Sequence, residues 1–118
     1  MVTIKQVAQA ALFADDLNLR LLAQEFLRNA PVLRNIPRPN TRDRRVLAVA
    51  AGLIELFALR AGQKPPAWTK SVGAAPEPIF LASDAIKMKR LRQLCLDESP
   101  EPLKKRQLYA TPNFLTFV

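Results

Sequence analysis

The sequence predicts an all-α protein in which four to five helices pack around a central buried helix at about 41–61, with Pro-rich connectors. The strongest observation is the segment 46–59, where every residue except Glu55 is apolar or Gly. A helix that is apolar on all sides must be buried, and these fourteen residues are too few to span a bilayer, which needs about 20. The other long apolar segments also show helical spacing, and prolines concentrate in 31–40 and 62–82.

The first two helices are predicted to form an antiparallel hairpin. Thr3, followed by Gln6, has the spacing of a capping box and begins a helix at about 3–14. The second helix begins after Asp15 or Asp16 and ends near 29–30, because Pro31 disfavours a helical residue before it. Acidic residues at its start would repel phosphates, so we do not expect this pair to read DNA as a helix-turn-helix.

The central helix has clear boundaries and two unfavourable features. Asn40 or Thr41 is the predicted N-cap, Asp43 lies in the first turn, and Gly62 is placed to end the helix. The nearby cluster of Arg42, Arg44 and Arg45 opposes the helix dipole. Glu55 would be costly as an unpaired buried charge, so we expect it to pair with an arginine or with the backbone N–H groups of a turn, rather than to act in catalysis.

The connector that follows, at about 63–82, contains the only Trp. Trp68 is expected to fold back over the core and to donate a hydrogen bond through its indole N–H. The alternative is an exposed anchor for a partner, because Trp is a common hot-spot residue. Residues 79–81 are predicted to be a short strand or a plug that packs against the core.

The C-terminal part is basic. Ser83 is expected to cap a helix at about 84–96 whose apolar stripe includes Cys95 as a buried residue, and Ser99 is expected to cap another short helix. The full predicted stripe of the longer helix is Met88, Leu91, Leu94 and Cys95. The tail at 109–118 is apolar and contains Pro112, so we expect it to be ordered and to run extended across a groove.

The composition bounds the function. The chain is predicted to be a single domain, 1–118, with a three-helix part at 1–62, the connector at 63–82 and the basic part at 83–118. One Cys and no His exclude the usual zinc site and the Ser-His and Cys-His nucleophile pairs. There is also no Gly-rich phosphate loop. We therefore expect a non-enzymatic protein with no catalytic residue, metal or cofactor, located in the cytoplasm because its N-terminus does not resemble a leader.

The net charge is +8, and the segment from Arg34 to Arg45 carries five arginines against one acid. A solvated loop is the simplest interpretation, but arginine specifically suits bidentate contacts to anions. A basic surface attracts either an acidic protein or nucleic acid. The segment has no aromatic residue on which the bases of a single strand could stack. An acidic protein and nucleic acid nevertheless both stay open as partners, because a basic surface attracts either one.

Part of the second half resembles a known group of proteins. The stretches PPAWT, PIFL and ESPEPLKKRQLYATPNFL, within residues 65–118, resemble small bacterial proteins, some of them encoded beside a nucleotidyltransferase-like protein as in a toxin–antitoxin pair. The resemblance implies a cytoplasmic, antitoxin-like partner protein rather than an enzyme. It assigns no functional residue.

We therefore predict a small basic interaction protein, a regulatory or antitoxin-like subunit that binds a protein partner, without a membrane segment. The alternative is a nucleic-acid-binding module that uses the segments from Arg34 to Arg45 and from Lys87 to Arg106. The apolar tail and Trp68 favour a protein partner. The tail could dock on its own core, join two copies into a homo-oligomer or insert into a partner. The candidate partner-binding residues are Arg34, Arg38, Arg42, Arg44, Arg45, Trp68, Tyr109, Phe114 and Phe117.

Overall fold

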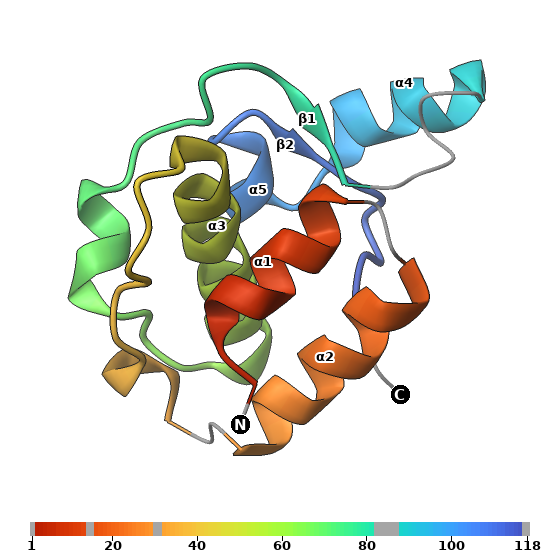
Figure 1. Cartoon of the computed structure of the whole chain (residues 1–118). Coiled ribbons are helices and arrows are strands. Elements are labelled where there is room, and N and C mark those ends of the chain that lie inside the picture. Colours follow the sequence, from red (N-terminus) through yellow and green to blue (C-terminus); the bar gives the residue numbers. More distant parts are fainter. Residues whose placement is uncertain (1, 14–15, 30–31, 82–87, 117–118) are drawn as a thin grey trace.

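The structure is a computed structural model that describes residues 2–13, 16–29, 32–81 and 88–116. Helix α3 (Arg44–Ala61) lies at its centre, with α1 (Ile4–Leu12) and the short α5 (Glu101–Lys104) packed against it (Figure 1). Helix α2 (Asp16–Asn29) packs on α1, and α4 (Lys89–Glu98) lies at the edge of the molecule. This arrangement confirms the predicted all-α fold around a central buried helix.

Helix α3 is buried along most of its length, as its apolar sequence predicted. Its N-cap is Asp43, whose carboxylate accepts from the N–H groups of Arg45 (2.9 Å) and Val46 (3.4 Å). The prediction of Asn40 or Thr41 as the cap was wrong, because the Thr41 hydroxyl instead accepts from Asp43 N–H (3.1 Å) and shapes the turn before the helix. Gly62 ends the helix as predicted, in the left-handed conformation with φ of 67°.

The first two helices form the predicted pair. Thr3 and Gln6 make both hydrogen bonds of the capping box, 2.9 and 3.3 Å long. Helix α1 ends at Leu12, two residues earlier than expected, with Phe13 as its C-cap. Helix α2 begins at Asp16 and ends at Asn29, and Asp15, the other predicted cap, lies outside the described residues.

Two short strands connect the Pro-rich connector to the C-terminal part. Strand β1 (Ile79–Phe80) pairs in parallel with β2 (Leu108–Tyr109), with Ile79 opposite Leu108. Residues 79–81 were predicted to be either a short strand or a plug against the core, and the structure has the strand at 79–80. Leu81, which follows the strand, is completely buried. The connector contains the 3₁₀ helix η2 (Ala67–Ser71), and another, η1 (Leu33–Asn35), follows α2.

The C-terminal helices differ from the prediction in two respects. Ser83 and the expected start of the longer helix lie outside the described residues, and in the described part α4 begins at Lys89. Its predicted apolar stripe is only partly buried: Cys95 is fully buried, whereas Met88 is 56% exposed and Leu94 36%. Ser99 does not cap α5, whose N-cap is Pro100, because the Ser99 hydroxyl accepts from Ala110 N–H (2.9 Å) in the segment after β2. Within the described residues, no helix has the length and hydropathy required to cross a membrane.

Candidate partner-binding surface

The segment 32–43, which we call the arginine connector, is held against the body at three points. Leu33 N–H donates to Gln63 Oε1 (2.9 Å), Trp68 Nε1 donates to the Ile36 carbonyl (2.8 Å), and Lys5 Nζ donates to the Asn40 carbonyl (3.1 Å). Pro37 and Pro39 have fixed φ angles and keep the intervening backbone extended. The connector is therefore a supported segment rather than a loop held only at its ends.

Trp68 joins the arginine connector to the body of the molecule. Its ring is half-buried and packs against the hydrophobic core, while its N–H bonds the connector backbone. The prediction of a core-packed, hydrogen-bonded indole is confirmed. A direct role of Trp68 as an anchor for a partner stays a prediction.

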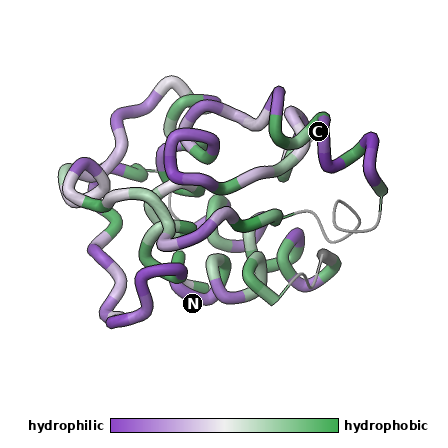
Figure 2. Tube along the Cα trace, turned by 90° about the horizontal axis from the view of Figure 1, so that it is seen from above, coloured by the Kyte–Doolittle hydropathy of each residue, from purple (hydrophilic) through white to green (hydrophobic). Residues whose placement is uncertain are grey.

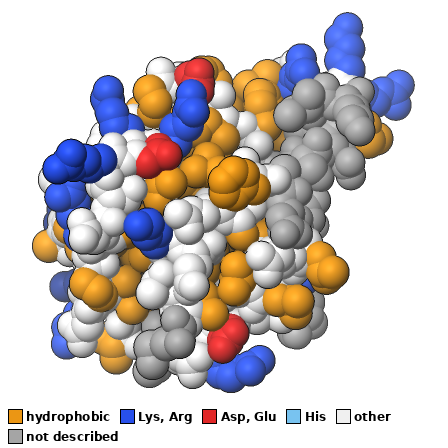
Figure 3. Space-filling view, in the orientation of Figure 1, with side chains coloured by type: hydrophobic (Ala, Val, Ile, Leu, Met, Phe, Trp, Pro, Cys, Tyr) orange, Lys and Arg blue, Asp and Glu red, His pale blue; other side chains and the backbone are white. Residues whose placement is uncertain are grey.

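Most arginines of the connector region are exposed and available. Arg34, Arg38, Arg42 and Arg44 are exposed, and within the described residues none of them forms an ion pair or a side-chain hydrogen bond. Arg45 is also exposed but forms an ion pair with Glu77, which neutralises it locally. Figure 3 shows Lys and Arg side chains gathered on the left of the molecule, over the N-terminal end of α3 and the segments beside it.

A groove of about 460 Å³ lies beside the arginine connector, and we call it the connector groove. Its walls come from the start of α1, from Phe26 of α2 and from the connector itself. Two cations, Lys5 and Arg38, stand among largely apolar lining residues. The apolar lining is Val2, Ile4, Phe26, Ile36, Pro37 and Pro39. Sequence reasoning missed this groove because three separate segments form it, although the apolar residues on both sides of Arg38 were a visible signal.

The C-terminal tail docks on its own core through residue 116. Phe114 and Leu115 pack against the core, and Arg60 of α3 donates to the carbonyls of Phe114 (2.6 Å) and Pro112 (3.5 Å). Tyr109 lies in β2 with its ring 5.5 Å from that of Phe80. The predicted docking on the core is therefore found for the described residues, but the predicted extended course is wrong for 112–115, which form turns. Phe117 lies outside the described residues.

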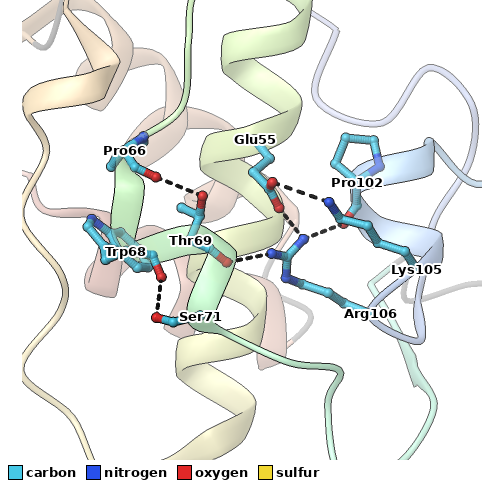
Figure 4. A network of polar contacts seen from close by, with 8 residues as sticks. All are labelled: Glu55, Pro66, Trp68, Thr69, Ser71, Pro102, Lys105 and Arg106. Carbon is cyan, nitrogen blue, oxygen red and sulfur yellow. Dashed lines mark hydrogen bonds and ion pairs between the residues drawn. The ribbon is translucent and has the colours of Figure 1, made fainter.

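The buried charge in α3 is paired, as expected. Glu55 forms ion pairs with Arg106 and with Lys105 (3.3 Å), and the guanidinium of Arg106 also donates to the carbonyls of Thr69 (2.8 Å) and Pro102 (3.3 Å). Figure 4 shows that these groups converge from α3, η2, α5 and the residues that follow α5. The network joins the two halves of the chain, and a structural role accounts for every one of these contacts.

Other chemistry is sparse in the part of the chain that the structure describes. These residues contain no group of three or more His, Cys, Asp or Glu side chains placed to hold a metal ion. Cys95 is fully buried, and burial raises the pKa of its thiol, which lowers its reactivity near neutral pH. Cys95 is therefore the buried apolar residue that the sequence predicted.

Comparison with protein-family models, with curated proteins and with solved structures found no match to this chain.

Proposed function

We propose that this protein is a small, basic, non-enzymatic interaction protein that binds an acidic segment of a partner protein. The observation that carries the proposal is the position of four exposed, unpaired arginines on or beside a supported connector that also forms one wall of an apolar groove. Cations and an apolar groove together fit a peptide that has both carboxylates and apolar side chains. Arginine is enriched at protein interfaces and binds carboxylates in a bidentate manner.

The groove and the arginines have different roles in this proposal. An exposed ion pair contributes only about 0 to 1 kcal/mol, so the arginines mainly raise the association rate and exclude basic partners. Apolar side chains that enter the connector groove supply most of the binding free energy, because burial of apolar surface is the dominant favourable contribution to most protein association. Carboxylates beside these side chains would meet Lys5 and Arg38, which line the groove.

We also propose a cytoplasmic, regulatory or antitoxin-like role. This part of the proposal is supported by the resemblance of residues 65–118 to small bacterial proteins encoded beside a nucleotidyltransferase-like protein. A nucleic-acid-binding module is the alternative, supported by the net charge of +8 and by the same arginines. We favour the protein partner because a phosphate backbone offers no apolar group to fill the connector groove.

The test is purification of the tagged full-length chain from its native host after nuclease treatment, followed by quantitative mass spectrometry. The double variant Arg38→Glu/Arg42→Glu is compared with Arg20→Glu/Lys64→Glu, which changes the net charge equally at exposed residues outside the connector. We expect an acidic protein that co-purifies in a fixed ratio with the wild type and the control variant but not with Arg38→Glu/Arg42→Glu. Equal recovery with both variants, or loss of the partner on nuclease treatment alone, would contradict the proposal.

A further inference from the structure

Helix α4 projects from the body of the molecule. Figure 1 shows it extending at the upper right, away from the other helices, and within the described residues Cys95 is the only fully buried residue of the helix. In Figure 2 its tube lies at the edge of the molecule and alternates between hydrophilic and hydrophobic residues. The body therefore covers only a small part of this helix.

The charges of α4 are arranged against the helix dipole. Lys89 and Arg90 occupy the first turn, whereas Asp97 and Glu98 occupy the last, and both placements are unfavourable because the helix N-terminus prefers anions and the C-terminus prefers cations. Met88, at the N-cap, provides no side-chain hydrogen bond. Within the described residues, Lys89 and Arg90 form no ion pair or side-chain hydrogen bond, and Figure 3 shows the Lys and Arg side chains clustered at the tip of this projection.

An apolar stripe lies beside these cations. Met88, Leu91 and Leu94 are three residues apart, which places them along one side of the helix. Met88 is 56% exposed, Leu94 is 36% exposed, and Leu91 is half-buried. Apolar residues at this spacing are the anchors by which an amphipathic helix enters a groove.

We infer that α4 is a docking helix for a partner groove with an apolar floor and a rim of carboxylates. Exposed Met88 and Leu94 would fill the floor, and the rim would neutralise Lys89 and Arg90. Carboxylates at this end would also relieve the unfavourable dipole interaction, because anions are favoured at a helix N-terminus. This inference is independent of the arginine connector, since it uses none of its residues.

Other partners fit α4 less well. A helix that lies on a membrane usually carries Trp or Phe among the residues of its apolar face, whereas α4 as the structure describes it has no aromatic residue. Nucleic acid would contact the cations, but it would leave Met88 and Leu94 without apolar partners. Both partners are therefore outcomes that the test must distinguish from an acidic protein groove.

The test uses calcium-loaded calmodulin as a probe, because its opened groove is Met-rich and takes basic amphipathic helices. Full-length protein is titrated by calorimetry as wild type, as Lys89→Glu/Arg90→Glu and as Leu94→Ser, with Arg20→Glu/Lys64→Glu as the charge control. We expect binding that is about tenfold weaker for each α4 variant, as for the loss of one interface anchor, and unchanged for the control. Circular dichroism melting of each variant shows whether it is folded, and the charge variant still tests the inference if Leu94→Ser unfolds.

Three outcomes would overturn the inference. The first is failure of the wild type to bind calmodulin, and the second is equal binding by all variants and the control. The third is binding of the wild type to phosphatidylserine vesicles or to a single-stranded RNA, titrated in parallel, that Lys89→Glu/Arg90→Glu abolishes, while calmodulin does not bind. If the calmodulin titration gives the expected result but the connector test fails, only the proposed function is contradicted.

Discussion

Glu55 and Arg106 form a buried ion pair between α3 and the turn that follows α5. The Arg106 side chain is 4% exposed and that of Glu55 12%. A buried cation without its partner raises the free energy of the folded state. The pair therefore fixes the position of the C-terminal part of the chain on α3. The backbone carbonyls of Thr69 and Pro102 complete the surroundings of the guanidinium.

Removing the charge of Glu55 should therefore destabilise the fold strongly. Glu55→Gln leaves Arg106 buried without its counter-charge, and we expect the free energy of unfolding to fall by about 3 kcal/mol. The matched control is Glu77→Gln, which breaks the exposed pair with Arg45 and should cost at most about 1 kcal/mol. Urea unfolding measures both, and similar costs for the two variants would show that the buried pair has no special role.

Trp68→Phe tests whether the indole N–H holds the arginine connector. The variant keeps an aromatic ring against the core but removes the donor to the Ile36 carbonyl, at an expected cost of about 1 kcal/mol. Hydrogen exchange measured by mass spectrometry should become faster in 32–43 and stay unchanged in α1. If exchange in the connector is the same as in the wild type, the hydrogen bond does not restrain this segment.

Cys95 should make stability depend on alkaline pH. Burial raises the pKa of its thiol above the ordinary value of about 9.0, so the folded state keeps the proton at a pH where the unfolded state releases it. Unfolding therefore becomes more favourable as the pH rises above the unfolded pKa. We compare urea unfolding of the wild type and of Cys95→Ala between pH 7.5 and 10. The wild type should lose more stability than the variant, and parallel pH profiles would contradict the burial of the thiol.

Deleting residues 112–118 tests the docking of the tail on its own core. The deletion removes the packing of Phe114 and Leu115 and leaves Arg60 without its two carbonyl acceptors. We expect a lower melting temperature for the monomer, measured by circular dichroism alongside light scattering. An unchanged melting temperature combined with lost self-association would instead identify the tail as an interface between copies.

Local rules predicted the features that local sequence determines. The capping box of Thr3 and Gln6, the end of α3 at Gly62 and the burial of α3 each follow from short patterns. The pairing of Glu55 was also predictable, because a buried carboxylate needs a partner, but nothing local identified Arg106 as that partner. The two residues lie far apart in the sequence and meet only when α5 packs on α3.

The features that were missed depend on distant segments. The Ser99 hydroxyl bonds a residue beyond β2 rather than its own helix, and the connector groove exists only when three segments meet. The apolar stripe of α4 is present in the sequence, but an amphipathic pattern does not show whether another element of the same chain covers it. Here the body leaves Met88 and Leu94 exposed.

The claim that the connector arginines serve a protein rather than nucleic acid is tested most directly by a salt titration. The full-length chain is titrated against a fluorescent DNA duplex of random sequence, by anisotropy, at about 50 and about 200 mM salt. We predict sequence-indifferent binding in the micromolar range or weaker at the lower salt concentration, which disappears at the higher one because it depends on counterion release. Tight binding that survives physiological salt and selects one sequence from the pool would contradict the account and favour the nucleic-acid-binding alternative.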